Sequence, residues 1–284
     1  MDTKLIDGNE IASTIKKKLV SDIKNIKAKG INPHLEAVLV GDDAGAKIYA
    51  KNQEKSCGEL GISYKLDELP ESTSQKELEE FIQKLNENPQ VTGIILQMPV
   101  PSGINGREVQ MKISPSKDVE GIHPLNIGKL LYGKNRIAPC TALAVMEILK
   151  SMNVRLKGKE VVIVGHSEIV GKPLMLLLLQ SPLESPTPTI CHIATKDLSF
   201  HTKRADILIV AAGRAGLVKG DMIKEGAVVI DVGINRVDKK IVGDVVFDEA
   251  VKKASLITPV PGGVGPVTTV MLLKNTISCL PADS

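Results

Sequence analysis

The sequence predicts an α/β protein of two domains with parallel-sheet cores, the C-terminal one a Rossmann-type dinucleotide-binding domain. Three observations lead to this prediction. The chain has 284 residues, which is more than one hydrophobic core usually organises. Short β-branched runs alternate along it with longer amphipathic segments. In the C-terminal half, a glycine-bearing turn stands between an apolar run and a helical segment.

The first half of the chain alternates helical and strand patterns, as βαβ units do. The patterns predict helices over residues 8–29, 46–60 and 74–86, and strands over 35–40, 62–66 and 91–97. Such alternation is typical of a parallel sheet. The last of these strands runs into a segment rich in Pro and Gly, residues 99–106. Loops at this end of a strand commonly build binding sites in open α/β sheets.

The second half repeats the alternation with strands that are almost wholly apolar. A helix over 142–152 is followed by GKEVVIVG, a helix over 169–180, TICHIA, ADILIVAAG and GAVVIDVGIN. Strands of this kind are expected in a parallel sheet covered on both faces. We therefore predict a first domain over residues 1–145 and a dinucleotide-binding domain over 146–265, with a terminal helix over 267–280.

The composition favours an ordinary globular protein of the cytoplasm. Hydrophobic residues make up 43% of the chain and charged residues 24%. The apolar stretch 174–179 is too short to span a bilayer, and the N-terminus lacks the pattern of a signal peptide. A net charge of +3 is spread along the chain and aromatic residues make up 2%, so no nucleic-acid partner is expected. Without a CxxC pair or suitably spaced histidines, no metal site is predicted.

The predicted nucleotide turn runs from Gly165 to Gly171, between the strand GKEVVIVG and a helix. A helix N-terminus in this position can hold a pyrophosphate through its free amides. The spacing is GxSxxxG instead of the commoner GxGxxG, and an ordinary tight turn explains it about equally well. Two later strands end in small residues, at Ala212-Gly213 and Gly233-Ile234, which strengthens the prediction of a dinucleotide site.

The end of the next strand favours NADP as the cofactor, with NAD as the alternative. NAD sites usually carry an acidic residue about 20 positions beyond the glycine turn. Here the strand ends in His192-Ile193-Ala194-Thr195-Lys196, which contains no acid. Thr195 and Lys196, together with His166, can accommodate a 2′-phosphate. The same residues can equally be solvated loop residues.

Several segments together resemble one family, the bifunctional methylenetetrahydrofolate dehydrogenase/methenyltetrahydrofolate cyclohydrolases. They occur in the family's order and cover nearly the whole chain: KIYAKNQEKSCGELGI, GIILQMPVP, KDVEGIHPLNIG, PCTA, VIVGHSEIVGKP, ADILIVAAG, VVIDVGIN and TPVPGGVGPVT. The resemblance implies a homodimer that binds a tetrahydrofolate derivative between its domains, with a terminal segment, 266–284, that packs back on the first domain. It also implies oxidation of 5,10-methylenetetrahydrofolate to the methenyl compound, followed by hydrolysis to 10-formyltetrahydrofolate.

The resemblance also assigns residues to the site. Tyr49 and Gln97 match the family's tyrosine and glutamine beside the reacting folate, where a ring face and a neutral amide are useful. Thr268 matches the threonine that begins the terminal helix. The remaining substrate-binding residues are Pro99, Glu120, Pro259, Gly262 and Gly263, and the cofactor-binding residues are Gly165, His166, Ser167, Ile169, Thr195, Ala212, Gly213, Ile234 and Thr268. Each also has an ordinary structural explanation, as a half-buried aromatic, a satisfied amide or a tight turn.

Two positions depart from the family's pattern. Gln53 stands where the family has a lysine, one helical turn after Tyr49, and Glu120 stands where the family usually has aspartate. Lys51 and Lys55 lie roughly 160° around the helix from position 53, so neither can replace the missing amine. We count Tyr49, Gln53, Gln97 and Glu120 as the catalytic positions.

The loss of the lysine affects the two reactions differently. Hydride transfer requires alignment and exclusion of water, whereas hydrolysis requires a group that moves protons. We therefore predict that the dehydrogenase activity survives and that the cyclohydrolase activity is weak. Two alternatives stay open on the sequence alone: a catalytically silent folate- or nucleotide-binding protein, and another two-domain dehydrogenase.

Overall fold

The computed structural model describes residues 3–281, which fall into two compact units. The six-stranded unit comprises Pro139–Met271 and the chain up to Ser13, and the three-stranded unit comprises Thr14–Ala138 and the chain from Leu272 onward. The helices α1 (Gly8–Ala28) and α10 (Val264–Ser278) each begin in the first unit and continue into the second. Within residues 3–281, no helix has the length and apolar character needed to cross a membrane.

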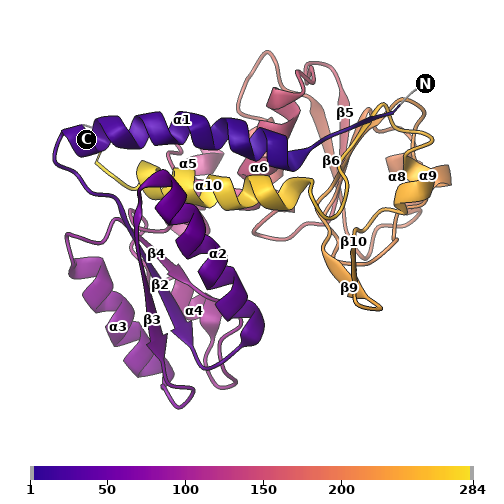
Figure 1. Ribbon diagram of the computed structural model, residues 1–284. Helices are drawn as coiled ribbons and strands as arrows, with labels where there is room; N and C mark the ends of the chain where they lie inside the picture. Colours follow the sequence, from indigo (N-terminus) through magenta and orange to yellow (C-terminus); the bar gives the residue numbers. More distant parts are fainter. Residues whose placement is uncertain (1–2, 282–284) are drawn as a thin grey trace. The chain divides into compact units, whose positions relative to one another are not determined.

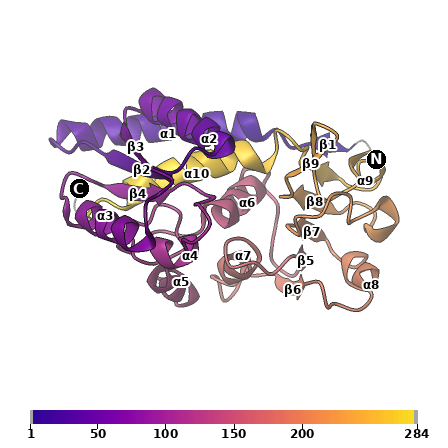
Figure 2. The ribbon, with the colours of Figure 1, turned by 90° about the horizontal axis from the view of Figure 1, so that it is seen from below.

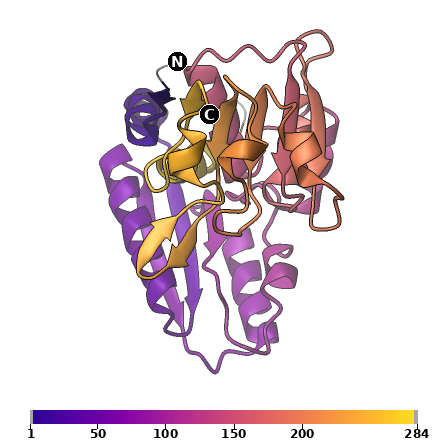
Figure 3. The ribbon, with the colours of Figure 1, turned by 90° about the vertical axis from the view of Figure 1, so that its right-hand side faces the viewer.

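The six-stranded unit contains a parallel sheet in the order β1-β11-β8-β7-β5-β6. Its strands are β1 (Lys4–Leu5), β5 (Glu160–Val164), β6 (Thr187–Cys191), β7 (Ile207–Val210), β8 (Val228–Asp231) and β11 (Leu256–Ile257). Its further helices are α6 (Cys140–Ser151), α7 (Gly171–Leu178), α8 (Leu198–Thr202), η1 (Gly220–Met222) and α9 (Phe247–Ala250). A separate antiparallel hairpin, β9 (Asn235–Val237) and β10 (Lys240–Val242), projects beside it (Figure 3).

Helices cover both faces of this sheet (Figure 2). Side chains of β5, β7 and β8 that share one face, among them Val162, Leu208 and Val229, form a buried cluster with Ala250 of α9. The alternate residues of the same strands, such as Ile163, are also fully buried. Because both faces are buried, these strands are almost wholly apolar, and the predicted Rossmann-type sheet is confirmed.

The three-stranded unit is built on a parallel sheet in the order β3-β2-β4. The strands are β2 (His34–Val40), β3 (Ser63–Leu69) and β4 (Gly93–Leu96), and the helices are α2 (Ala44–Leu60), α3 (Gln75–Glu87), α4 (Gly106–Gln110) and α5 (Pro124–Leu131). α2 and α3 lie on opposite sides of the sheet (Figure 1). Leu78 and Ile82 of α3 pack on Val38 and Leu96, which fixes the core on that side.

Local sequence signals explain where the two long helices of this unit begin. Asp43 caps α2 by accepting from the amide of Ala46, so the helix begins two residues before the predicted start. Ser74 and Glu77 form a complete capping box at the start of α3. Such capping side chains can be recognised in a sequence because each of them bonds to a residue only three positions away.

Near both ends of the chain, the boundaries of the two units differ from the predicted domain boundaries. β1 pairs with β11, so the residues before Thr14 belong with the six-stranded sheet and not with residues 14–138. The end of α10 belongs to the three-stranded unit, where Asn275 donates to the carbonyls of Val119 and Ala138. Two-residue strands such as β1 carry no periodic pattern, which is why sequence reasoning missed them.

Besides α2, three helices begin two or three residues away from the predicted start: α6 at Cys140, α7 at Gly171 and α10 at Val264. The terminal helix begins at Val264, so Thr268 lies inside it and donates to the carbonyl of Val264 instead of starting the helix. Pro266 lies in the first turn of this helix, where proline is tolerated because no amide is needed there. The helix predicted over 169–180 begins at Gly171, because Val170 before it has non-helical backbone angles, φ −129° and ψ −72°.

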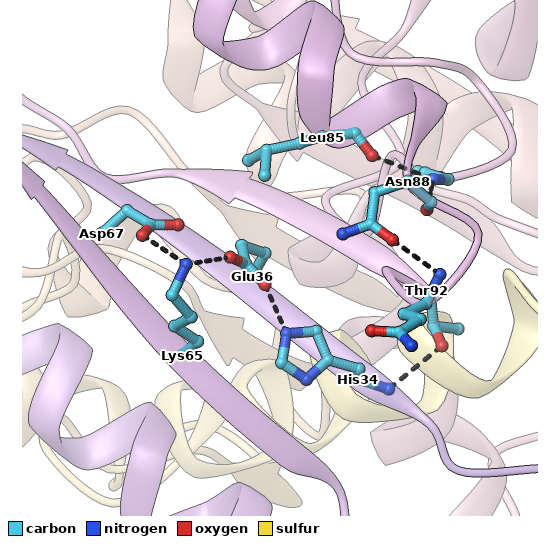
Figure 4. A network of polar contacts seen from close by, with 9 residues as sticks. His34, Glu36, Lys65, Asp67, Leu85, Asn88 and Thr92 are labelled. Atoms are coloured by element: carbon cyan, nitrogen blue, oxygen red, sulfur yellow. Dashed lines mark hydrogen bonds and ion pairs between the residues drawn. The ribbon is translucent and has the colours of Figure 1, made fainter.

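A polar network links β2 and β3 of this sheet (Figure 4). Glu36 of β2 is 3% exposed, and it bonds to His34 on its own strand and to Lys65 of β3 at 2.8 Å. Lys65 also contacts Asp67 at 2.6 Å. Burial raises the pKa of Asp67. The pKa of Glu36 is lowered, because the ion pair and hydrogen bonds of Glu36 outweigh the effect of its burial. No sequence pattern predicted this network.

Candidate active site

The first cavity lies in the six-stranded unit at the carboxyl ends of β5, β6 and β7 and has a volume of about 500 Å³. It brings together five of the predicted cofactor residues. Its lining consists of Val164, Gly165, His166, Ser167, His192, Ile193, Thr195, Leu198, Ala211, Ala212, Arg214 and Leu217. This is the place in an open α/β sheet where a dinucleotide is expected.

The two glycines that bound the turn at this cavity have no room for a side chain. Gly165 has φ +116°, and a Cβ on it would stand 2.1 Å from the carbonyl oxygen of Ala211. A Cβ on Gly171 would stand 2.0 Å from the carbonyl oxygen of Gly165. The strand, the turn and α7 therefore approach one another closely, as the backbone must where it receives a pyrophosphate. These residues fit a dinucleotide.

The turn after β6 forms another wall of this cavity. Thr195 accepts from the amide of His192 at 2.9 Å, and His192 Nδ1 accepts from the amide of Ala194 at 3.2 Å. The rings of His166 and His192 lie 4.8 Å apart. Arg214, which sequence reasoning missed, also lines this cavity, and the described lining residues include no carboxylate. Arg214 follows the strand ending Ala-Ala-Gly, and that position was its only sequence signal.

Four predicted cofactor residues lie outside this cavity. Ile169 is exposed before α7, and Gly213 is next to the lining residue Ala212 without lining the cavity itself. Thr268 lies inside α10. Ile234 lines a second cavity instead.

The second cavity, of about 540 Å³, lies in the same unit and gathers the predicted glycine-proline loop. It is lined by Asn9, Asp231, Val232, Gly233, Ile234, Ile241 and residues 259–266. A Cβ on Gly263 would stand 2.5 Å from the carbonyl oxygen of Pro259, so the loop depends on an absent side chain. Asp231 was not predicted; burial raises its pKa to about 6, against three backbone amides that donate to it.

The third cavity lies in the three-stranded unit, has a volume of about 310 Å³ and contains four predicted site residues. Tyr49 comes from α2, Gln97 and Pro99 follow β4, and Glu120 comes from the loop before α5. The rest of the lining is Asp43, Gly45, Ala46, Ile95, Leu96 and Met98. The structure brings Tyr49, Gln97, Pro99 and Glu120 to one cavity although they come from distant parts of the sequence, whereas Pro259, Gly262 and Gly263 line the second cavity.

Gln53 does not line this cavity but lies beneath it. Its side chain is 1% exposed, and its Oε1 accepts a hydrogen bond from Nε2 of Gln97 at 2.7 Å. Lys51 and Lys55 are exposed, which agrees with the predicted opposite face of the helix. No amine of α2 therefore reaches Gln97 from this side.

Glu120 is the group best suited to gain or lose a proton near neutral pH. Burial raises its pKa to about 7, the negative charge of Asp118 adds to the rise, and a hydrogen bond from Gln110 opposes it. The Gln110 Nε2 atom donates to Glu120 at 3.1 Å. Asp118 itself is held by the amides of Gly121 and His123 and by Asn126, so its charge is fixed close by.

Among residues 3–281 the structure shows no group of three or more His, Cys, Asp or Glu side chains placed to hold a metal ion. A Rossmann-type sheet with a glycine turn at its cavity, in one chain with a second parallel-sheet unit that has its own polar cavity, defines an α/β protein of the dinucleotide-binding class. The particular family follows from comparison with known proteins.

Residues 139–283 match the family model described as tetrahydrofolate dehydrogenase/cyclohydrolase, NAD(P)-binding domain, and residues 6–120 match the catalytic domain of the same description. The Bifunctional protein FolD of Bacillus velezensis is 49% identical over 278 residues, which cover 98% of this chain and 97% of that protein. This chain belongs to the tetrahydrofolate dehydrogenase/cyclohydrolase family. The resemblance predicted from its motifs is confirmed.

Solved structures agree with this assignment. The bifunctional FolD methylenetetrahydrofolate dehydrogenase/cyclohydrolase of Campylobacter jejuni has a TM-score of 0.94 and 46% identity, with 98% of both chains covered. The enzyme of Trypanosoma brucei, solved with NADP and an inhibitor, has a TM-score of 0.91 and 39% identity, covering 98% of this chain and 97% of that one. An NAD-dependent methylenetetrahydrofolate dehydrogenase from Saccharomyces cerevisiae has a TM-score of 0.80 and 25% identity, covering 98% and 97%.

Proposed function

We propose that the chain oxidises 5,10-methylenetetrahydrofolate to 5,10-methenyltetrahydrofolate with NADP, and that its hydrolysis of the methenyl product is weak. The observation that carries the proposal is the cavity of Tyr49, Gln97 and Glu120, beneath which Gln53 occupies the position of the family's lysine. We assign the folate to this cavity. The dinucleotide is assigned to the cavity beside Gly165.

The side chains of the site suit the oxidation. When bound, the dinucleotide supplies a nicotinamide ring that accepts a hydride from the folate. Tyr49 offers a ring face to the flat substrate, and Gln97 offers a neutral amide that does not oppose the positive charge forming on the folate. Glu120, once ionised, stabilises that charge. None of these roles requires a lysine.

The hydrolysis lacks a comparable group. Water must be deprotonated as it attacks the methenyl carbon, and an amide such as Gln53 does not accept that proton. Glu120, with a pKa of about 7, is the remaining candidate for this work. General acid–base catalysis typically contributes about 100- to 10,000-fold, so without it the reaction falls toward the uncatalysed rate.

Cofactor preference, assembly and location belong to the same proposal. The wall of His166, His192, Thr195 and Arg214 supports NADP, because its lining includes positive or neutral groups and no carboxylate that would repel a 2′-phosphate. NAD stays the alternative. We further propose a homodimer of cytoplasmic location, which sedimentation of the purified protein and fractionation of cells would test.

The test is a paired assay on the purified protein. Oxidation of methylenetetrahydrofolate is followed with NADP and with NAD, and hydrolysis of methenyltetrahydrofolate is followed separately. Gln53→Lys is assayed in parallel, and Asn52→Lys, which adds a lysine at the neighbouring exposed position, is the control. We expect oxidation by all three proteins, and hydrolysis raised about 100-fold or more in Gln53→Lys alone.

Three other outcomes would change the proposal. Ordinary hydrolysis by the unaltered protein would show that another group, Glu120 first, moves the proton. Faster oxidation with NAD than with NADP would reverse the cofactor assignment. Absence of both reactions, with folate or dinucleotide still bound, would favour a silent binding protein.

A further inference from the structure

Asp244 lies behind the wall of the dinucleotide cavity and holds it in place. Its side chain is 0% exposed. One carboxylate oxygen accepts from the amides of Ala212 at 2.6 Å and Gly213 at 2.8 Å, and the other accepts from the amide of Arg214 at 2.8 Å. Three consecutive backbone amides therefore converge on one carboxylate, an arrangement that fixes both the position and the direction of this segment.

Two further contacts fix the carboxylate itself. Asn235 donates from Nδ2 to Asp244 Oδ1 at 2.8 Å, and the backbone amide of Asp244 donates to Asp231 Oδ1 at 3.0 Å. A Cβ on Gly233 would stand 2.2 Å from Cγ of Asp244, so the carboxylate is also enclosed by backbone. The loop after β7 is thus tied to Asp244 by partly buried hydrogen bonds.

The segment held in this way is the part of the cavity wall that carries Arg214. Ala212 and Arg214 both line the cavity, and Arg214 is the only lining residue in the described part of the chain with a permanently charged side chain. Since the amides of residues 212–214 are used by Asp244, they are not free to bind a phosphate. The guanidinium of Arg214 is the group that this segment offers to an anion.

We infer that Asp244 is a positioning residue for dinucleotide binding, which holds Arg214 where its guanidinium meets a phosphate of the cofactor. This inference rests on the proposed function and extends it. Asp244 does not touch the ligand. It acts through the backbone of Ala212, Gly213 and Arg214, and a displacement of about 1 Å in such a wall is enough to weaken binding strongly.

The direct test replaces Asp244 with asparagine. The Nδ2 group of the new asparagine is a donor, and it faces backbone amides that are also donors. The segment of residues 212–214 must therefore move. We expect the KM and Kd for NADP to rise about tenfold or more, with kcat and the KM for methylenetetrahydrofolate changed less than about threefold. Glu249→Gln is the matched control, because Glu249 accepts a backbone amide from Gly220 at 2.8 Å in the same unit and lines neither cavity of that unit.

A double-mutant cycle separates positioning from a general loss of structure. If Asp244 acts through Arg214, the effect of Asp244→Asn on the Kd for NADP should shrink to less than about threefold in an Arg214→Met background. An equal effect in both backgrounds would overturn the inference. If Asp244→Asn does not fold, Asn235→Ala, which removes one donor to the carboxylate, takes its place with an expected rise in Kd of about two- to fivefold.

The inference and the proposed function fail in different ways. An unchanged Kd for NADP in folded Asp244→Asn and Asn235→Ala would overturn the inference while the proposed function stands. Failure of the unaltered protein to bind or use either NADP or NAD would overturn both. A rise in Kd equal to that of Glu249→Gln would also overturn the inference.

Discussion

Gln97 and Gln53 form a buried hydrogen bond in the three-stranded unit, with Gln97 Nε2 donating to Gln53 Oε1 over 2.7 Å. Both side chains are nearly inaccessible to solvent. Within residues 3–281, the Nε2 atom of Gln53 has no hydrogen-bond partner. The hydrogen bond therefore uses the Nε2 donor of Gln97 and the Oε1 acceptor of Gln53. The buried Nε2 donor of Gln53 stays unsatisfied.

The energy of this pair can be measured with Gln53→Met, Gln97→Met and the double variant. Each single change leaves a buried amide without its partner and is expected to cost about 1–3 kcal/mol of the free energy of unfolding. The double variant removes both polar groups, so its loss should be smaller than the sum by about 1 kcal/mol. Urea unfolding of the four proteins measures this difference. Strict additivity would mean that the hydrogen bond does not contribute to stability.

The pKa of Glu120 leads to a second prediction. Burial raises this pKa to about 7, so the fraction of Glu120 that is ionised increases as the pH rises from 6 to 8. An ionised carboxylate stabilises the cation formed in the oxidation, and kcat should therefore increase with pH over this range. In Glu120→Gln, we expect a lower kcat at pH 8 and a flat profile.

Asp231 provides the control for this profile, because burial raises its pKa to about 6 and it lies in the other unit. Asp231→Asn should leave an inflection near pH 7 in place. If the inflection disappears in Asp231→Asn and persists in Glu120→Gln, the carboxylate responsible is not Glu120. Initial rates at saturating substrate between pH 5.5 and 8.5 decide between them.

The site residues that sequence reasoning found and missed differ in the range of their interactions. Gly165 stands at the end of an apolar strand, so the order of elements was enough to place it at a cavity, whereas Gln97 was assigned by the resemblance to the family. Asp244 and Arg214 act across the sheet, 30 residues apart in sequence, and no local pattern marks their contact. The raised pKa of Glu120 depends on burial by the folded loop, which a sequence does not display.

The prediction of secondary structure also depended on the range over which a sequence pattern extends. Long elements such as α1 and β2 were predicted within about two residues, because their periodicity extends over many positions. β1, β9, β10 and β11 have two or three residues each and were not predicted. The partners of such short strands are decided by packing that is distant in sequence.

The network around Lys65 gives a third prediction. Lys65→Met removes the cation between Glu36 and Asp67, which then face each other as two carboxylates in a partly buried place. We expect a loss of about 1–3 kcal/mol in the free energy of unfolding at pH 7.5, less than for a fully buried pair because Lys65 is largely exposed. Because burial raises the pKa of Asp67, a larger fraction of this carboxyl is protonated as the pH falls, and the loss should be smaller at pH 5 than at pH 7.5.

Lys253→Met is the matched control for Lys65→Met. Lys253 forms an ion pair with Glu225 at 2.9 Å in which both side chains are substantially exposed. Such pairs contribute about 0–1 kcal/mol, so this variant should differ little from the unaltered protein at either pH. Equal losses in the two lysine variants would show that the network near Glu36 has no special role in stability.

The glycine turn gives the last prediction. In Gly165→Ala, the new Cβ would stand 2.1 Å from the carbonyl oxygen of Ala211, and the backbone at this position has φ +116°. β5 and the loop after β7 must then separate, which displaces the floor of the dinucleotide cavity. We expect binding of NADP to weaken by about 100-fold or more. Titration with NADP, with the folded fraction checked by circular dichroism, measures the effect.

Gly226→Ala is the control that distinguishes the steric clash at position 165 from the backbone strain of a positive φ angle. Gly226 has φ +77° and lies in the same unit, and a Cβ added to it would meet no atom within 4 Å, so alanine there introduces strain without a clash. Its cost should be about 1–2 kcal/mol of stability, with the affinity for NADP unchanged. If both variants lose affinity equally, the cause is the strain common to positive φ angles. If only Gly165→Ala loses affinity, the close approach of Gly165 to Ala211 is what shapes the cavity.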